Sequence, residues 1–385
     1  MEPLQGKRIA IICDDLSVRG GAEQVTLDIA ALYPNAPIYT SIYSKELFPE
    51  VASRVRPSIL QWLPAPLRRR HQYLAFLMPW VFWRCDLREY DVLISSCSRF
   101  SKCLTTRPGQ VHICYCHTPV RFLYHYRTEA TRRYPLPLWA RSVHLILPMM
   151  LRYFSWEDQR GAASVTHWVA NSEYIQGLIA RYYRAEATVI HPGARIEPFL
   201  RAAKNTLHKG DYFFALSRFV PHKHMDLIVR AFIANGLPIK IGGTGPEWQR
   251  CKQMIDDANA TNIELLGFVS DRDRERLWAA ARAWIFPSFE DFGIVGVESL
   301  AAGTVPLYYA GGGMAEIIPE GYGVPFYSQT VEALQQAVER FLATEDSFDT
   351  SVLQARARAF SVEAFQQQMR AFVDHAIAST APPQH

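Results

Sequence analysis

Two glutamates, Glu290 and Glu298, lie eight positions apart within residues 286–303, the most distinctive stretch of the sequence. Carboxylates accept hydrogen bonds from sugar and ribose hydroxyls, so this spacing could hold a nucleotide sugar at two points. Glutamate is usually solvated, but Glu298 lies among apolar neighbours, where an unpaired charge is costly. Residues 292–295 lie between the two carboxylates and just before an expected helix, whose first amides favour an anion.

Two cations, Arg218 and Lys223, follow another expected strand and lie five positions apart. An arginine fork and a lysine point charge at that spacing can flank a diphosphate, although a solvated loop is the better interpretation of this segment alone. Glycines follow three expected strands, at Gly20–Gly21, Gly242–Gly243 and residues 311–313, where the backbone can approach a phosphate. Each of these glycine sites is only weakly indicative, since loops are rich in glycine.

Several other patterns argue against metal and nicotinamide chemistry. The sequence has no G-x-G-x-x-G fingerprint, so a nicotinamide-dependent Rossmann enzyme is disfavoured. Cys114, Cys116 and His117 are close together, but without a second ligand pair they are interpreted as strand residues rather than a zinc site. Asp271 and Asp273 fall at an expected helix start and are interpreted as capping carboxylates. The seven cysteines have no disulfide spacing, which favours a reducing compartment.

The elements that must position these residues alternate along the chain. Short apolar runs are followed by helical patterns in both halves, which predicts an α/β protein with two doubly wound parallel sheets. The expected domains are residues 1–197, residues 198–360 and a C-terminal helix within 361–385 that packs back on the first domain. Residues 197–210 are expected to be a polar linker. Two such lobes imply a cleft, and ligands in these folds bind at the carboxyl ends of the strands.

The net charge of +4 conceals an uneven distribution, because residues 1–200 have a net charge of +8 and residues 201–385 of −4. Residues 54–152 alone have a net charge of +12, so an anionic partner is expected there. Aromatic residues accompany the arginine clusters, which suits the headgroup level of an anionic membrane. The candidate membrane or acceptor residues are Arg68, Arg69, Arg70, Trp80, Trp83, Arg132 and Arg133. Ordinary packed helices explain the pattern equally well, and nucleic acid is disfavoured because no recognition motif is present.

No apolar run approaches the ~20 residues that a bilayer-spanning helix needs. The N-terminus leads directly into an apolar strand and lacks the order of a signal peptide. These features predict a cytoplasmic protein, which the basic aromatic segments would associate peripherally with the inner face of the plasma membrane.

The motifs of the second half together resemble the C-terminal lobe of retaining glycosyltransferases of family 4, which have the GT-B fold. The resemblance rests on Arg218 and Lys223, on Gly242–Gly243, on Leu266-Gly-Phe-Val and on the Glu-x7-Glu pair. In the first half, Gly20-Gly-Ala-Glu23 resembles the glycine loop of that family. Residues 115–124, which include His117, resemble a segment of the mannosyltransferases that build O-antigen and exopolysaccharide on lipid carriers.

The resemblance implies a role for each motif residue. Arg218 and Lys223 would bind the donor diphosphate and offset the charge of the departing nucleoside diphosphate. Glu290 would contact hydroxyls of the donor sugar, Glu298 would hold the ribose, and His117 would lie near the transferred sugar. The other implied donor-binding residues are Gly20, Gly21, Gly243, Phe268, Val269, Phe292, Gly293, Ile294 and Val295.

These roles imply a retaining reaction in which the leaving phosphate acts as the base, so the protein supplies positioning and charge stabilisation. No metal or other cofactor is expected. The implied reaction moves a hexose, mannose from GDP-mannose, to a polyprenyl-diphosphate-linked glycan at a membrane surface. Two alternatives remain open. One is a UDP-sugar-dependent transferase with a soluble acceptor, and the other is a non-catalytic subunit that binds sugar nucleotides or glycans.

Overall fold

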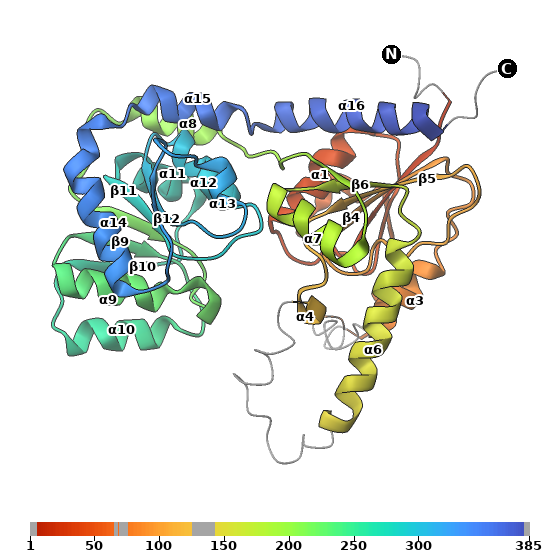
Figure 1. Ribbon diagram of the computed structural model, residues 1–385, viewed down its shortest axis with the longest axis horizontal. Helices are drawn as coiled ribbons and strands as arrows, with labels where there is room; N and C mark the ends of the chain where they lie inside the picture. The colour runs from red at the N-terminus through yellow and green to blue at the C-terminus, as the bar shows by residue number, and fades with distance from the viewer. Residues whose placement is uncertain (1–5, 65–67, 69–75, 125–142, 381–385) are drawn as a thin grey trace. The chain divides into compact units, whose positions relative to one another are not determined.

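The computed structural model describes residues 6–64, 68, 76–124 and 143–380, and the chain divides into two compact units. Unit 1 comprises Met1–His191 together with Phe365–His385, and unit 2 comprises Pro192–Ala364. A parallel sheet with helices around it forms the centre of each unit (Figure 1). The prediction of two doubly wound α/β domains is therefore confirmed.

Unit 1 is built on a seven-stranded parallel sheet in the order β3-β2-β1-β4-β5-β6-β7. The chain order reverses between β1 and β4, the point at which ligands bind in folds of this type. The strands are β1 (Ile9–Cys13), β2 (Ile38–Thr40), β3 (Val55–Pro57), β4 (Val92–Cys97), β5 (Val111–Cys116), β6 (His167–Ala170) and β7 (Ala187–Val189). The helices described are α1 (Gly21–Leu32), α3 (Met78–Trp83), α4 (Arg121–Tyr124), α6 (Val143–Ala162) and α7 (Glu173–Tyr183), with short 3₁₀ turns at Pro49–Val51 and Ile59–Trp62.

The last helix, α16 (Val362–Thr380), belongs mainly to unit 1 although it follows all of unit 2 in the sequence. Its buried apolar residues recur every four positions and therefore line one face of the helix. These residues are Phe365, Met369, Val373 and Ile377, and they share one hydrophobic core with residues of α1 and β1. Figure 1 shows α16, in dark blue, lying along unit 1 close to α1.

Unit 2 contains a six-stranded parallel sheet in the order β10-β9-β8-β11-β12-β13, again reversing beside its first strand. The strands are β8 (Phe213–Leu216), β9 (Ile239–Gly242), β10 (Ile263–Gly267), β11 (Ala283–Phe286), β12 (Val305–Tyr309) and β13 (Val324–Phe326). The helices are α8 (Glu197–Asn205), α9 (Met225–Asn235), α10 (Trp248–Asp257), α11 (Asp271–Ala280), α12 (Ile294–Ala301), α13 (Met314–Ile317), α14 (Val331–Thr344) and α15 (Thr350–Arg358), with 3₁₀ turns η5 (Pro221–Lys223) and η6 (Glu345–Ser347).

The expected linker at residues 197–210 is wrong over most of its length, because α8 occupies residues 197–205. Phe199 is buried and packs edge-on against Trp278, with 5.6 Å between the ring centroids. The polar composition that suggested a linker is the solvated face of an amphipathic helix. The division between the units accordingly falls after His191 rather than after residue 197.

Within the described residues, no helix is both long enough and apolar enough to cross a membrane. All seven cysteines are free, and six of them are buried. Four of the candidate membrane residues, Arg69, Arg70, Arg132 and Arg133, lie outside the described residues.

Candidate active site

The two residues that the sequence places at the donor sugar and diphosphate meet in unit 2. Lys223 ends the turn η5 that follows β8, and its ammonium forms an ion pair with the Glu290 carboxylate after β11. The Ser288 hydroxyl donates to the Lys223 carbonyl at 3.1 Å, which joins the two loops a second time. The charged side chains are 15% and 22% exposed, so both can still reach a ligand. A diphosphate that binds here would be a second anionic partner for the same ammonium.

Glycines after β12 support the backbone of Glu290. Gly312 has φ +70°, and a Cβ added to it would lie 2.0 Å from the Glu290 carbonyl oxygen. Gly313 donates its amide hydrogen to the same carbonyl at 2.9 Å. These glycines therefore allow two loops to pair closely, a structural role that residues 311–313 fill in addition to any contact with phosphate.

The glycines after β9 likewise allow close backbone packing against the loop that contains Arg218. A Cβ on Gly243 would lie 1.8 Å from the Ser217 carbonyl oxygen, and its φ of +129° also requires glycine. The Gly243 amide donates to the Gly267 carbonyl at 2.7 Å, so that hydrogen is already engaged. Arg218 itself is exposed, and its carbonyl accepts the Val220 amide at 2.9 Å, while its guanidinium forms no hydrogen bond or ion pair with any described residue.

Glu298 lies inside α12 and is buried, with 8% of its surface exposed. One carboxylate oxygen lies 3.7 Å from an Arg274 guanidinium nitrogen. The other, Oε2, has no hydrogen-bond donor among the described residues, and Arg274 Nε likewise has no acceptor there. Burial raises the pKa of Glu298 to about 7, although Arg274 opposes the shift. Ribose hydroxyls would satisfy the unpartnered oxygen, so the arrangement fits the role implied for this residue.

The start of α12 places the remaining loop residues beside these carboxylates. Phe292 is buried, Gly293 has φ +101° at the N-cap, and Ile294 and Val295 begin the helix with amides that have no partner within it. At the end of β10, the Phe268 ring is 83% exposed and its face is open to a planar base, while Val269 is half-buried.

The acidic pair Asp271 and Asp273 lies in the first turn of α11. The Ser270 hydroxyl is the N-cap and accepts the Asp273 amide at 3.2 Å, and both carboxylates lie in the first helical turn. The capping interpretation is confirmed. Among the described residues there is no group of three or more His, Cys, Asp or Glu arranged to hold a metal ion.

Asp14, directly after β1 in unit 1, organises the loop that follows β4. Its carboxylate accepts four consecutive backbone amides, of residues 98–101, at 2.7–2.9 Å. Asp15, the next residue, pairs with the Arg99 guanidinium. This Asp14 cradle, the four amides of residues 98–101 on one carboxylate, could not be predicted from the sequence. The only signal was an acidic pair at the end of a strand, because the partners lie more than 80 positions away.

His117 follows β5 and is buried, with 9% of its surface exposed. Its Nε2 lies 2.8 Å from the Ser96 hydroxyl, and its carbonyl accepts the Asn171 side-chain amide at 2.9 Å. Burial lowers the pKa of His117 to about 4, so the ring is neutral at physiological pH.

The glycine loop before α1 is less open to an anion than the sequence suggests. Gly20 is extended, with φ −142°, so its conformation does not require glycine, and Gly21 is the first helical residue. A Cβ on Gly20 would lie 2.7 Å from the Glu23 carboxylate, which therefore reaches back over the helix start. Burial raises the pKa of Glu23 to about 7. A phosphate that binds there would compete with this carboxylate.

The basic aromatic segments divide into packed and exposed side chains. Trp83 donates its indole hydrogen to Glu157 at 2.6 Å and stacks under the Arg160 guanidinium at 4.2 Å, so it is engaged within unit 1. Trp80 is 41% exposed and belongs to an apolar groove between α3 and α6 of about 710 Å³. The groove is lined by Phe76, Leu77, Trp80, Met149, Met150 and Tyr153. Arg68 is half-buried and donates to the Gln61 carbonyl at 3.1 Å.

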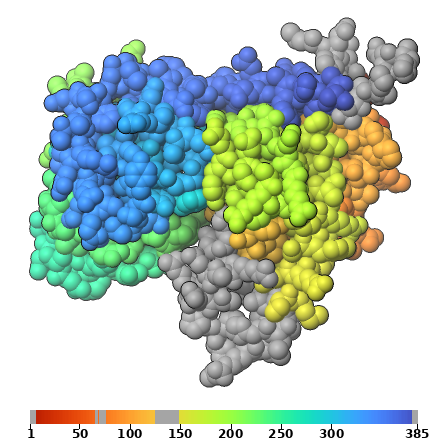
Figure 2. Space-filling view, viewed as in Figure 1, coloured from red at the N-terminus to blue at the C-terminus, as the bar shows by residue number. Residues whose placement is uncertain are grey.

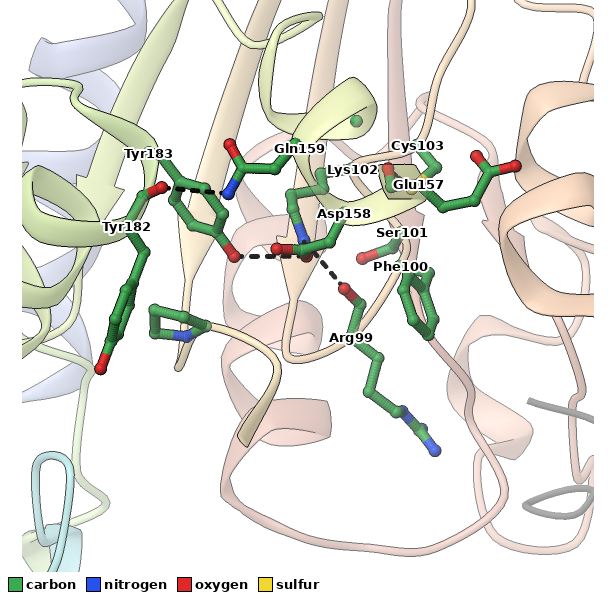
Figure 3. A network of polar contacts seen from close by, with 12 residues as sticks. Arg99, Phe100, Ser101, Lys102, Cys103, Glu157, Asp158, Gln159, Tyr182 and Tyr183 are labelled. Carbon is green, nitrogen blue, oxygen red and sulfur yellow. Dashed lines mark hydrogen bonds and ion pairs between the residues drawn. The ribbon is translucent and has the colours of Figure 1, made fainter. Parts of the chain in front are cut away.

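A buried ion pair anchors α6 to the loop that follows β4 in unit 1 (Figure 3). Lys102 donates to Asp158 at 2.5 Å and to the Arg99 carbonyl at 2.9 Å, and the two side chains are 2% and 0% exposed. Tyr124 and Tyr183 donate to the Asp158 carboxylate at 2.7 and 3.3 Å. In Figure 2 the surface of α6, in yellow, continues into that of α7, in yellow-green. The network ties α6 to the loop that Asp14 organises.

Comparison with known proteins assigns these features to a class. Residues 196–358 match the family model described as glycosyl transferases group 1. The chain is 29% identical over 154 residues to an uncharacterized glycosyltransferase of Methanocaldococcus jannaschii. The aligned segment covers 39% of this chain and 42% of that protein. It is 22% identical over 451 residues to the alpha-1,3/1,6-mannosyltransferase ALG2 of Kluyveromyces lactis, covering 97% of this chain and 86% of that protein.

Solved structures show the same fold over nearly the whole chain. Anabaena Alr3699/HepE in complex with UDP has a TM-score of 0.67 at 18% identity, covering 95% of this chain and 100% of that one. Sucrose-phosphate synthase from Thermosynechococcus elongatus has a TM-score of 0.69 at 16% identity, covering 97% and 100%. The chain thus has the GT-B fold, and its residues 196–358 match the group 1 glycosyl transferase model. The alignments with the first curated relatives cover less than half of their length, 42% of the Methanocaldococcus protein and 35% of a Bradyrhizobium glycogen synthase.

Proposed function

We propose that the protein is a retaining glycosyltransferase that moves a hexose from a nucleotide sugar to a lipid-diphosphate-linked oligosaccharide. The observation that carries the proposal is the arrangement at the strand ends of unit 2. There Lys223 meets Glu290, and the buried Glu298 carboxylate keeps one oxygen without a donor among the described residues. Cations placed for a diphosphate and carboxylates placed for hydroxyls are what a sugar-nucleotide site needs.

In this reaction Lys223 and Arg218 offset the negative charge that develops on the departing diphosphate, which is the main contribution of the protein to the rate. Glu290 orients the sugar through its hydroxyls, and Glu298 fixes the ribose. The acceptor hydroxyl attacks from the face that the diphosphate leaves, and the leaving phosphate takes its proton. No metal is required by this scheme, so transfer should continue in the presence of a chelator.

The donor is proposed to be GDP-mannose, and the weak likeness to a mannosyltransferase over 97% of the chain supports that choice. A UDP-sugar is the second candidate, because the similar Anabaena structure contains UDP. A non-catalytic binding subunit is less well supported, since Arg218, Lys223, Glu290 and Glu298 are all in place.

A donor-dependent transfer assay with a polyprenyl-diphosphate glycan tests the proposal. Glu290→Ala and Lys223→Ala should each lower kcat by about 10²-fold or more, because each removes an interaction with developing charge or with the reacting sugar. Lys240→Ala and Glu264→Ala are matched controls, since these residues form an ion pair of 3.1 Å on the same sheet. Full activity in both site variants would refute the site. Tight donor binding without transfer or hydrolysis would favour the binding subunit.

A further inference from the structure

A cavity of about 590 Å³ opens at the edge of the unit 1 sheet where the strands begin. Its lining includes Ile9, the first residue of β1, together with residues that precede β2, β3 and β4 and the turn that follows α1. Asp14 and His117 follow the opposite, carboxyl ends of the strands. The cavity is therefore separate from those residues, and its volume is typical of a pocket for a small molecule.

The charged side chains that line this cavity are all cationic, and none of the described lining residues is acidic. The cations are Lys7, Arg8, Arg54 and Arg56. Arg8 forms an exposed ion pair of 3.4 Å with Glu89. Lys7 acts on the Asp91 carboxylate, which the Arg8 amide and Arg107 also engage. The carboxylates near the cavity are thus shared among several cations, and its net charge stays positive.

Arg54 is held in place by backbone carbonyls. Its Nη1 atom lies 2.9–3.4 Å from four carbonyl oxygens, those of Ala30, Tyr33, Pro34 and Ala36. They belong to the last turn of α1 and the turn after it, the negative end of the helix dipole, so the arginine offsets their charge. Its Nε and Nη2 hydrogens have no acceptor among the described residues. The Nε–Nη2 edge is therefore fixed in position and open to a ligand.

Arg56 is arranged in a similar way at the mouth of the cavity. Its Nη1 donates to the carbonyls of Ser53 and Val55 at 3.2 Å, and it forms no ion pair with a described carboxylate. The guanidinium is thus anchored on one side, while the side chain as a whole is exposed. Two arginines held by backbone carbonyls lose little further freedom when an anion binds to them.

We propose that this cavity is a second anion site, which binds a soluble small molecule with two adjacent phosphate groups. The Nε–Nη2 edge of Arg54 would bind one phosphate through two parallel hydrogen bonds, and Lys7 and Arg56 would offset the charge of the other. The site is additional to the proposed donor site of unit 2 and does not depend on it.

The free protein leaves the charge of this cavity uncompensated. Burial lowers the pKa of Arg54, and no carboxylate opposes that effect. The guanidinium nevertheless remains charged at neutral pH, as arginine does in proteins. Four cations around one cavity repel one another, and a bound anion would reduce this repulsion. A diphosphate that binds only to the folded protein should therefore raise its stability.

The surroundings of the cavity favour a soluble ligand over a lipid headgroup. The large apolar side chains that are exposed in unit 1 include Trp62, Trp80 and Met149, and none of those described lines this cavity. A surface that docks on a bilayer needs apolar side chains beside its cations. The phosphate groups are therefore expected to come from a molecule in solution.

Calorimetric titration of the full chain with inorganic pyrophosphate tests the proposal. The titration uses Lys223→Ala as its background, because this change removes a cation of the proposed donor site. One pyrophosphate should bind, about tenfold more tightly than orthophosphate. Addition of Lys7→Ser and Arg56→Ser should weaken pyrophosphate binding at least about tenfold. Both side chains are exposed, so these changes should leave the fold intact.

The matched control adds Lys45→Ser and Arg88→Ser to the same background. These two cations are also exposed in unit 1 but lie outside the cavity, so pyrophosphate affinity should not change. Arg54→Lys, which keeps the charge and removes the fork, should weaken binding while orthophosphate affinity changes less. In the wild-type background, Lys7→Ser with Arg56→Ser should leave GDP affinity unchanged.

Amide hydrogen exchange locates the bound pyrophosphate, which should slow exchange in residues 32–37 and 53–56. Equal pyrophosphate affinity with and without the Lys7 and Arg56 changes would overturn the proposal, as would protection confined to unit 2 or equal affinity for orthophosphate. Anionic vesicles provide the last arm. If vesicles bind through Lys7 and Arg56 and pyrophosphate does not bind, the cavity takes a lipid headgroup and the soluble ligand is refuted.

Discussion

At the scale of single residues, Glu298 illustrates how a side chain that serves ligand binding can reduce the stability of the free protein. Glu298 is a carboxylate buried in α12 with one oxygen that has no donor among the described residues, an arrangement that ordinarily destabilises a protein. A bound ribose would satisfy that oxygen, so the cost would be recovered only when the donor is present. The same residue should therefore reduce the stability of the free protein and increase its affinity for a nucleotide.

Replacement of this carboxylate should stabilise the free protein in a pH-dependent way. The pKa of Glu298 is raised from 4.5 to about 7 in the fold, so its favourable contribution is complete below pH 4.5 and is lost as the pH rises through about 7. Glu298→Gln removes this loss. The variant should gain about 3 kcal/mol in the free energy of unfolding relative to wild type between pH 4.5 and 8.

Urea unfolding at the two pH values measures the difference, and Glu264→Gln, at an exposed position, is the control that should show almost none. Glu298→Gln should also bind nucleoside diphosphates more weakly than wild type. A difference between variant and wild type that does not change with pH would contradict the burial of this carboxylate and the raised pKa that follows from it.

At the scale of elements, the sequence predicts helices and strands correctly where the pattern that defines them lies within a few consecutive residues. The alternating strands and the acidic first turn of α11 each depend on residues a few positions apart, and these predictions agree with the structure. α8 was mistaken for a linker because its polar face dominates the composition of residues 197–205. The Asp14 cradle and the Lys102–Asp158 pair could not be predicted, since their partners are 84–87 and 56 positions apart.

The Lys102–Asp158 pair should matter for stability far more than a surface ion pair. Asp158→Ala leaves the Lys102 ammonium buried without its counter-charge and should cost about 3–5 kcal/mol. Glu89→Ala breaks the exposed pair with Arg8 and should cost less than about 1 kcal/mol. Denaturant unfolding compares the two variants.

The double variant Lys102→Met with Asp158→Leu separates charge burial from packing. It should recover much of the loss, because apolar residues of similar size need no counter-charge. Equal effects of Asp158→Ala and Glu89→Ala would show that the buried pair does not anchor α6.

At the scale of the whole molecule, the positive charge and the exposed apolar side chains of unit 1 favour binding to a membrane surface. Residues 54–152 have a net charge of +12, and the groove between α3 and α6 exposes aromatic and methionine side chains. Cations beside an exposed apolar surface are typical of proteins that dock on anionic bilayers. The proposed lipid-linked acceptor would be presented at such a surface.

Sedimentation with vesicles that contain an anionic phospholipid tests this docking. Replacement of Arg68, Arg69 and Arg70 by Ser should reduce binding several-fold at low salt, and high salt should reduce the binding of wild type, because surface charges are screened. The matched control replaces three exposed arginines of unit 2, Arg250, Arg272 and Arg276, by Ser. Equal binding by both triple variants would contradict a role for the first cluster.

The central claim is that unit 2 contains a sugar-nucleotide site built from Arg218, Lys223, Glu290 and Glu298. Calorimetric titration of the full chain with GDP, UDP and ADP tests it most directly. We predict that one of these nucleotides binds, GDP in the first instance, and that Lys223→Ala and Glu298→Gln each weaken its binding at least about tenfold, or 1.4 kcal/mol, whereas Lys240→Ala does not. Absence of binding by all three nucleotides, or equal affinity in wild type and both site variants, would contradict the claim.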